Sequence, residues 1–398
     1  MRVIIPLFLV LKGLGGGYQF LFEKMGLGRY QGPLTGIFIS ALLIFVLSQL
    51  SRRVSFKEFT FQGATRSCIP LALLMMFVIV VYAEEIQKTP LNIQQSDMIP
   101  MTLAGLSDFT QGKNPYCSRI LEGNHYQPGL YIPGIWLPYL PAFLLGIDIR
   151  WTNILPTLIL FIIILLNMNS SGSATLRWQL FFLLITVSFS KVFRTQPASG
   201  HLVLLETTYP LFIWSVLHKR TQWTGWLLAF LINSREIACV LVFPFLLYSY
   251  WHRRELFRNW LIKFMVVTVV LNLPFIVWAG SAFFDQSREY QRTFVATHAD
   301  QMLAHWGTLG ILKEWGMAHW GGRLQLFGIF SVSLFANRIK EEAAIVWGAI
   351  SWLWIILLMP TTWAYLFIQP TQPIVLLAAH KWNYQSKFNS SSNSSGRS

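Results

Sequence analysis

The stretch 67–83 reads SCIPLALLMMFVIVVYA and contains no charged side chain. An α-helix rises about 1.5 Å per residue, so roughly 20 apolar residues cross the ~30 Å hydrocarbon core of a bilayer. The apolar residues follow one another without alternation, which indicates a helix and excludes a strand of a membrane barrel. We therefore expect this stretch to span a membrane.

Similar apolar runs recur along the chain. They lie near residues 3–22 (a weaker run, broken by a lysine and by glycines), 34–50, 152–168, 177–192, 202–217, 222–233, 237–251, 261–279, 324–336, 343–358 and 363–379. Apolar residues make up 54% of the chain and charged residues only 12%, whereas soluble domains carry about 25% charged residues. The sequence thus predicts an all-α, polytopic integral membrane protein with about 11–12 transmembrane helices.

The net charge of +14 does not indicate a nucleic-acid-binding protein, because no basic stripe is interleaved with exposed aromatic residues. The basic residues form short clusters between apolar runs, as the orientation signals of membrane proteins do. The three cysteines, Cys68, Cys117 and Cys239, provide no even disulfide framework, so we expect no disulfide bond.

Segment 131–147 decides the topology. Its prolines, Pro133, Pro138 and Pro141, each remove a helical hydrogen bond. If the segment does not span, the basic clusters between the apolar runs all face the cytoplasm, as the positive-inside rule favours. If it spans, most of them are exported. We therefore expect a re-entrant or interfacial segment, packed against protein.

This topology places two long loops outside, at 84–151 and 280–323, and these loops hold most of the carboxylates. Long polar loops on a rigid scaffold are where binding and catalysis concentrate. The sequence suggests four parts: 1–66, additional membrane helices and a cytoplasmic loop; 67–280, a core membrane module; 281–380, the second outer loop and C-terminal helices; and 381–398, a disordered cytoplasmic tail.

The first outer loop opens with an amphipathic pattern. Ile99, Leu103, Leu106 and Phe109 recur at three- and four-residue spacing from just past Asp97. This spacing predicts a helix lying along the membrane surface, with Asp97 at its N-terminal end. The Gly-Lys-Asn-Pro-Tyr sequence that follows predicts a turn that ends the helix.

The order of motifs in this loop resembles a known family. Asp97 is followed by Gly-x-Asn-Pro-Tyr at 112–116, by Tyr-x-Pro at 131–133, and by a proline-broken stretch ending Gly-x-Asp-x-Arg at 146–150. This order is similar to the polytopic glycosyltransferases with the C-type fold, which use polyprenyl-phosphate sugars and include bacterial mannosyltransferases. Residues 67–280 fit the pattern in order.

The resemblance implies that Asp97 acts on the acceptor hydroxyl, as a base or through a metal ion. A carboxylate within hydrogen-bond reach can take the proton of this poor nucleophile as the new bond forms. Alternatively, Asp97 only caps the interfacial helix. Asp108 is a second carboxylate candidate or a solvated residue of the polar face. Tyr116, within the motif, is a candidate substrate contact.

A departing lipid phosphate needs cationic stabilisation, which arginine supplies through forked hydrogen bonds. The candidates are Arg150, Arg194, Arg235 and Arg323. Arg235 is the most informative, because Asn-Ser-Arg-Glu at 233–236 interrupts an apolar run, and ionisable groups at membrane depth mark function or an internal partner. The alternatives are a loop without a ligand for Arg235, and interfacial anchoring for Arg150 and Arg194.

Two further candidates flank or enter the run at 202–217. His201 precedes the run, and Glu206, within apolar sequence, is expected to face a cavity or a partner. In the second outer loop, the spacing of His298, Asp300 and His305 is suggestive of a metal site, but without a compact ligand motif ordinary polar positions of an interfacial segment are the favoured explanation. We assign no metal ligand, and a divalent cation (Mg²⁺ or Mn²⁺) stays open as a cofactor.

Together these features favour a glycosyltransferase of the cell membrane, a multi-pass protein of a bacterial plasma membrane. It would move a sugar from a polyprenyl-phosphate donor to a glycan, lipid or protein acceptor on the non-cytoplasmic face, by inverting displacement with Asp97 as base. No Gly-rich phosphate loop and no Asp-x-Asp is present, which disfavours a nucleotide-sugar donor. The alternatives are a transporter or flippase of a lipid-linked glycan, which inverted repeats would favour, and a non-catalytic membrane subunit.

Overall fold

The computed structural model describes residues 64–91, 98–117, 119–121, 125–127, 131–169, 200, 202–235, 238–285, 320, 323–328, 331, 341–357 and 376–377. The chain divides into two compact units. Unit 1 comprises 1–85, 157–196 and 363–398, and unit 2 comprises 86–156 and 197–362.

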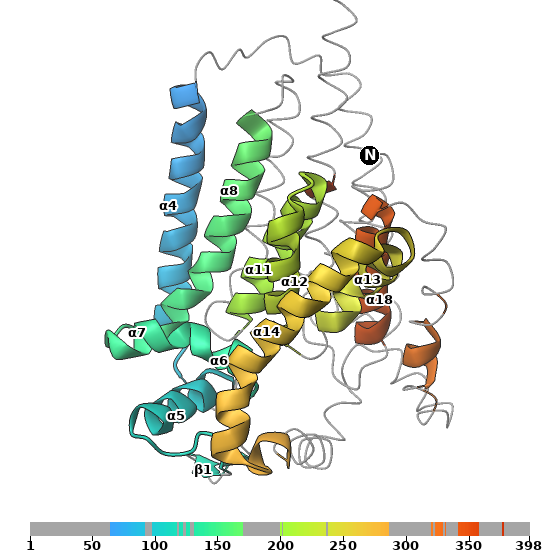
Figure 1. Cartoon of the computed structure of the whole chain (residues 1–398). Coiled ribbons are helices and arrows are strands. Elements are labelled where there is room, and N and C mark those ends of the chain that lie inside the picture. Colours follow the sequence, from blue (N-terminus) through green and yellow to red (C-terminus); the bar gives the residue numbers. More distant parts are fainter. Residues whose placement is uncertain are drawn as a thin grey trace, which may run out of the picture. The chain divides into compact units, whose positions relative to one another are not determined.

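The described residues are mostly helical (Figure 1), as the sequence predicts. The longer helices are α4 (Ala64–Lys88), α5 (Met98–Thr110), α8 (Leu155–Asn169), α11 (Val203–Leu217), α12 (Thr221–Ser234), α13 (Cys239–His252), α14 (Arg254–Ala279) and α18 (Glu341–Leu357). A short antiparallel hairpin, β1 (Arg119–Leu121) with β2 (His125–Gln127), is an element that the sequence did not predict.

Helix α14 is the one helix among the described residues that is long and apolar enough to cross a membrane. Leu261, Met265, Val269 and Val277 are among the large apolar side chains that it exposes. Monomeric soluble proteins rarely expose contiguous apolar surface on this scale. The structure therefore contains one candidate span, while the number of spans stays a prediction.

The described part of unit 1 includes most of α4 and α8. Their contact includes a hydrogen bond between the buried hydroxyls of Tyr82 and Thr157, 2.9 Å apart. A hydroxyl buried among apolar side chains needs such a partner, because burying it alone costs about 1–3 kcal/mol.

In unit 2, α12 packs against both α11 and α14, and α13 packs against α18. Small residues allow the close approaches. A Cβ added to Gly225 would overlap the Trp260 ring, and one added to Gly348 would overlap the backbone of Leu241. The predicted interruption of the apolar run is present, because α12 ends at Ser234 and α13 begins at Cys239.

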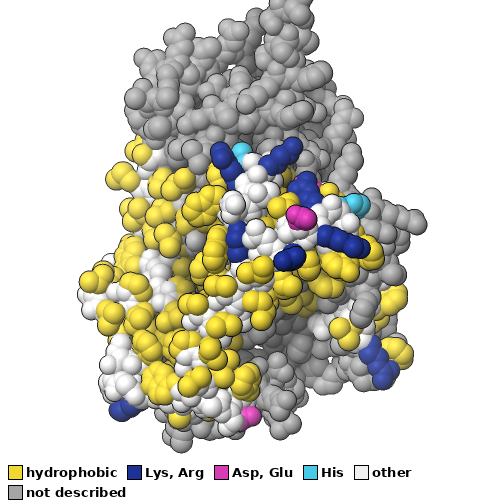
Figure 2. Space-filling view, viewed as in Figure 1, with side chains coloured by type: hydrophobic (Ala, Val, Ile, Leu, Met, Phe, Trp, Pro, Cys, Tyr) yellow, Lys and Arg dark blue, Asp and Glu magenta, His cyan; other side chains and the backbone are white. Residues whose placement is uncertain are grey.

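The basic turns of unit 2 lie at one end of its helices. The Trp260 indole donates to the carbonyl of Thr221 at 3.2 Å, and the Lys263 ammonium donates to the carbonyl of Gln222 at 3.0 Å. These bonds place the α11–α12 turn beside the N-terminal part of α14. Figure 2 shows the resulting cluster of Lys and Arg side chains above a largely hydrophobic surface. The distribution of basic residues in the sequence predicted that these two turns lie on the same side of the membrane.

The other end of α14 packs against the first outer loop. Phe275 lies 5.3 Å from Trp136 and 5.9 Å from Phe109, measured between ring centroids. The predicted surface helix is α5, and it ends where expected, with Gly112 in the left-handed region at φ 73°. A glycine adopts that conformation without steric cost.

Segment 131–147 forms no continuous helix. It is divided into α6 (Pro133–Trp136), the 3₁₀ turn η3 (Leu137–Tyr139) and α7 (Leu140–Leu144), each with a proline at its first or second position. A further 3₁₀ element, η4 (Ile149–Ile154), leads into α8. The expectation that the prolines break this stretch is confirmed.

Candidate functional site

Three of the predicted site residues, Asp97, Arg194 and His201, lie outside the described residues, as do His298, Asp300 and His305. The others are found in unit 2. Arg323 belongs to the second outer loop, and the rest lie in the first outer loop or at the ends of α11 and α12 that face it.

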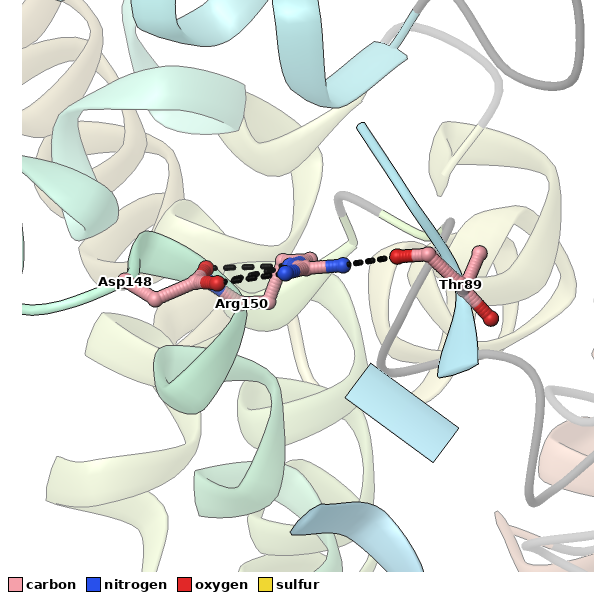
Figure 3. A network of polar contacts seen from close by, with 3 residues as sticks. All are labelled: Thr89, Asp148 and Arg150. Carbon is pink, nitrogen blue, oxygen red and sulfur yellow. Dashed lines mark hydrogen bonds and ion pairs between the residues drawn. The ribbon is translucent and has the colours of Figure 1, made fainter. Parts of the chain in front are cut away.

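Arg150 is held on all sides by its own loop (Figure 3). Its Nε donates to both Asp148 oxygens at 3.0 Å, its Nη2 to Asp148 at 2.6 Å, and its Nη1 to the carbonyl of Thr89 at 2.6 Å. The residue is only 7% exposed. Bidentate pairs of this kind fix geometry as well as charge. Arg150 therefore ties the end of α4 to the start of η4.

The carboxylate of Asp148 also caps η4, because it accepts the backbone N–H of Arg150 at 3.0 Å. Burial disfavours the charged form of this carboxyl group. The hydrogen bonds and the positive charge of Arg150 outweigh that effect and lower the pKa of Asp148 from its ordinary value of 3.8. The pair is thus ionised at neutral pH.

A second polar group connects η3, η4 and the start of α11. The hydroxyl of Tyr139 donates to Oδ1 of Asn153 at 2.5 Å, and Nδ2 of Asn153 donates to the carbonyl of Gly200 at 3.0 Å. Tyr139 is fully buried and Asn153 is 8% exposed. We had not predicted either residue as part of a site. The only sequence signal for Asn153 is its polar side chain near the start of the apolar run at 152–168.

Glu206 lies close to this group. It is buried in the first turn of α11, and its expected role in facing a cavity or a partner stays a prediction. Burial raises the pKa of Tyr139 well above its ordinary value, and the negative charge of Glu206 raises it further. Two other side chains of α11, Thr207 and Tyr209, have buried hydroxyls without a hydrogen-bond partner among the described residues.

Arg235 follows α12 in an extended conformation and is partly buried. Its position depends on Asn233, which donates to the Thr268 hydroxyl at 2.9 Å and accepts from the Asn272 amide at 2.9 Å. Helix α6 lies against the same turn, where a Cβ at Gly134 would overlap the carbonyl of Asn233. The break that carries Arg235 is therefore fixed by both α14 and the first outer loop.

Tyr116 and Asp108 have different surroundings. Tyr116 is 1% exposed, its ring packs against Phe275 and Phe283, and its hydroxyl accepts from the Trp136 indole at 3.3 Å. Burial raises its pKa. Tyr116 thus anchors the loop in the aromatic core, and its contact with a substrate stays a prediction. Asp108 is partly exposed on α5, away from that core.

Arg323 lies over the ring of Trp320, 5.0 Å from its centroid, and is exposed. Within the residues that the structure describes, no three His, Cys, Asp or Glu side chains come together as metal ligands would. Cys117 and Cys239 form no disulfide bond within the described part of the chain.

The arrangement gathers chemically distinct groups around the start of α11 and the end of α12. A buried carboxylate, an amide and a phenol are suited to hydroxyl groups, and a guanidinium is suited to an anion. Comparison of the chain with protein-family models, with curated proteins and with solved structures gives no match.

Proposed function

We propose that the protein is a polytopic membrane glycosyltransferase that uses a polyprenyl-phosphate sugar at the non-cytoplasmic face of a cell membrane. One observation carries the proposal. Polar and ionisable side chains, among them Glu206 and Asn153, are buried where otherwise apolar helices meet the first outer loop. Ionisable groups at such depth mark function or an internal partner.

Unused hydrogen-bonding capacity supports a polyhydroxyl ligand. The buried hydroxyls of Thr207 and Tyr209 have no partner among the described residues. Leaving such a group unsatisfied costs about 1–3 kcal/mol, so each buried group of this kind needs an explanation. A sugar or an ordered water beside α11 would satisfy them.

The surroundings of Arg150 and Arg235 suggest different roles for these two arginines. Arg150 already makes a fork with Asp148 and a bond to Thr89, so we assign it the task of holding the loop. Arg235, presented by the fixed turn after α12, is the better candidate for the lipid phosphate. In the proposed step it would stabilise the charge that develops on the leaving oxygen.

The reaction would be a single displacement with inversion. The acceptor oxygen forms a bond to C1 of the sugar while the bond from C1 to the phosphate oxygen breaks, and polyprenyl phosphate leaves. Asp97, which opens the loop, would take the acceptor proton. Whether a divalent cation assists stays open.

The test is turnover by the purified full chain. The protein is incubated with polyprenyl-phosphate mannose and an acceptor mixture, and released polyprenyl phosphate is measured. We expect turnover by the unaltered protein and a loss of about 10²–10⁴-fold in Asp97→Asn. Asp285→Asn, which removes an exposed carboxylate, is the matched control and should keep the rate.

Undiminished release by folded Asp97→Asn would reject the assigned base. Binding of the donor without release by the unaltered protein would instead favour transport or a non-catalytic role.

A further inference from the structure

We propose that the basic end of unit 2 binds the headgroup of an anionic phospholipid. The site consists of Lys219 and Arg220 in the α11–α12 turn and of Arg254 and Arg258 at the start of α14. This inference depends on membrane association but not on the transferase activity.

The two parts of the site form one surface. The bonds from Trp260 to Thr221 and from Lys263 to Gln222 bring the turn and the helix together. The α13–α14 junction is fixed in turn by the ion pair of Arg253 with Glu341, 2.8 Å long. Figure 2 shows a group of Lys and Arg side chains on the visible face, with acidic side chains among them.

The positive charge of the site is largely unneutralised. The four basic residues of the site are all exposed, and none of them makes an ion pair within the described part of the chain. Glu255, which lies between Arg254 and Arg258 in the sequence, contributes a single negative charge. Arg253 is the basic residue here whose charge is balanced, by Glu341. Such a cluster attracts an anion.

Aromatic side chains occupy the next level of the surface. Trp226 lies 5.6 Å from the Lys263 ammonium, and Tyr250 lies 5.7 Å from the Arg254 guanidinium, measured to the ring centroids. Trp223 and Trp251 are 64% and 54% exposed. Exposed Trp and Tyr are enriched at the level of lipid headgroups.

Beyond the aromatic level the surface becomes aliphatic. Leu261, Ile262 and Met265 are exposed on α14, roughly 10–17 Å along the helix from Arg254 at 1.5 Å per residue. Cationic, aromatic and aliphatic levels therefore follow one another in the order of phosphate, glycerol and acyl chain. A soluble anion needs only the first level, and a nucleic acid needs a basic stripe without the apolar surface. The phospholipid is the occupant that uses all three.

The experiment measures lipid binding to the detergent-purified full chain by native mass spectrometry. The probes are phosphatidylglycerol, phosphatidylcholine of the same acyl length, and inorganic phosphate as competitor. We expect phosphatidylglycerol to bind at least tenfold more tightly than phosphatidylcholine, to weaken at high salt, and to resist millimolar phosphate.

Two double variants locate the site. Arg254→Gln with Arg258→Gln, and separately Lys219→Gln with Arg220→Gln, should each weaken phosphatidylglycerol binding by roughly 10–30-fold, since each basic residue near an anionic surface contributes about fivefold. Lys88→Gln with Lys113→Gln removes equal charge from two exposed positions of the first outer loop and should leave binding unchanged. An unshifted thermal transition in detergent shows that a variant is folded.

Several results would overturn the proposal. These are equal binding of the two lipids, unchanged binding in both folded double variants, and complete displacement by inorganic phosphate, which would indicate a site for free anions. Equal loss in the control variant would show a general effect of net charge.

Discussion

The side-chain amide of Asn153 donates to the backbone carbonyl of Gly200, 3.0 Å away and 47 positions later in the chain. The same side chain accepts the hydroxyl of Tyr139. One amide therefore satisfies two buried groups and fixes the backbone just before α11. That helix carries Glu206, so the orientation of the buried carboxylate depends on this bond.

Replacing Asn153 by alanine would remove the nearer acceptor of the Tyr139 hydroxyl, which would keep only the Gly200 carbonyl at 3.4 Å, and would remove the amide that donates to that carbonyl at 3.0 Å. We expect the free energy of unfolding to fall by about 1–3 kcal/mol. Tyr139→Phe should cost less, because it removes one donor and keeps the ring. A double-mutant cycle of the two changes, measured by denaturant titration in detergent, should show coupling. Strict additivity would contradict the shared bond.

The Asp148–Arg150 pair predicts a pH dependence of stability. The pKa of Asp148 is lowered in the folded protein, so its stabilising contribution is complete above the ordinary pKa of 3.8 and is lost as pH falls through the folded value. Asp148→Asn should therefore lower the thermal midpoint at neutral pH and reduce its decline on acidification. Asp285→Asn, an exposed site, should follow the unaltered curve. A parallel decline in Asp148→Asn would exclude the pair as the cause.

Gly134 predicts a steric effect. A Cβ there would overlap the carbonyl of Asn233, which belongs to the turn before Arg235. Gly134→Ala should destabilise the protein by about 1–3 kcal/mol and reduce any activity that needs Arg235. Gly112→Ala meets open space but has φ 73°, so its cost, about 1–2 kcal/mol for a side chain in the left-handed region, should come without a functional loss. The thermal midpoint and donor binding together separate the two effects.

Sidedness can be tested with thiols. Cys117 is exposed in the first outer loop, and Lys219 is exposed at the basic end. In a variant whose only cysteine is Cys117, a membrane-impermeant maleimide should label intact spheroplasts. A variant whose only cysteine replaces Lys219 should react only after permeabilisation. Labelling of both in intact cells would contradict the predicted topology.

Local sequence patterns predicted the elements whose causes are local. The spacing of Ile99, Leu103 and Leu106 predicted α5, which runs from Met98 to Thr110. Prolines predicted the division of 131–147, because each removes a donor at a definite position. The Asn-Ser-Arg-Glu interruption predicted the break between α12 and α13.

Contacts between distant residues were beyond such patterns. The Asn153–Gly200 bond joins residues 47 apart, and the Asn233–Asn272 bond joins residues 39 apart, so no periodicity encodes them. The hairpin of β1 and β2 has strands of three residues, too short for alternation to be read. The partner of Arg150 was nevertheless only two residues away in the sequence, in the Asp-x-Arg motif.

The prolines at the first or second positions of α6, η3 and α7 also reduce the number of backbone N–H groups in this stretch that need hydrogen bonds from water. The start of a helix leaves backbone amides without intrahelical acceptors, and three consecutive starts would multiply them. Proline has no amide hydrogen, so each of these helix starts has one fewer backbone N–H that needs a hydrogen-bond acceptor from water. Irregular backbone can thus approach the hydrocarbon region at a lower free-energy cost of dehydration. Alanines at the same positions would add the unpaired N–H groups back, and they would also make a longer helix easier to form.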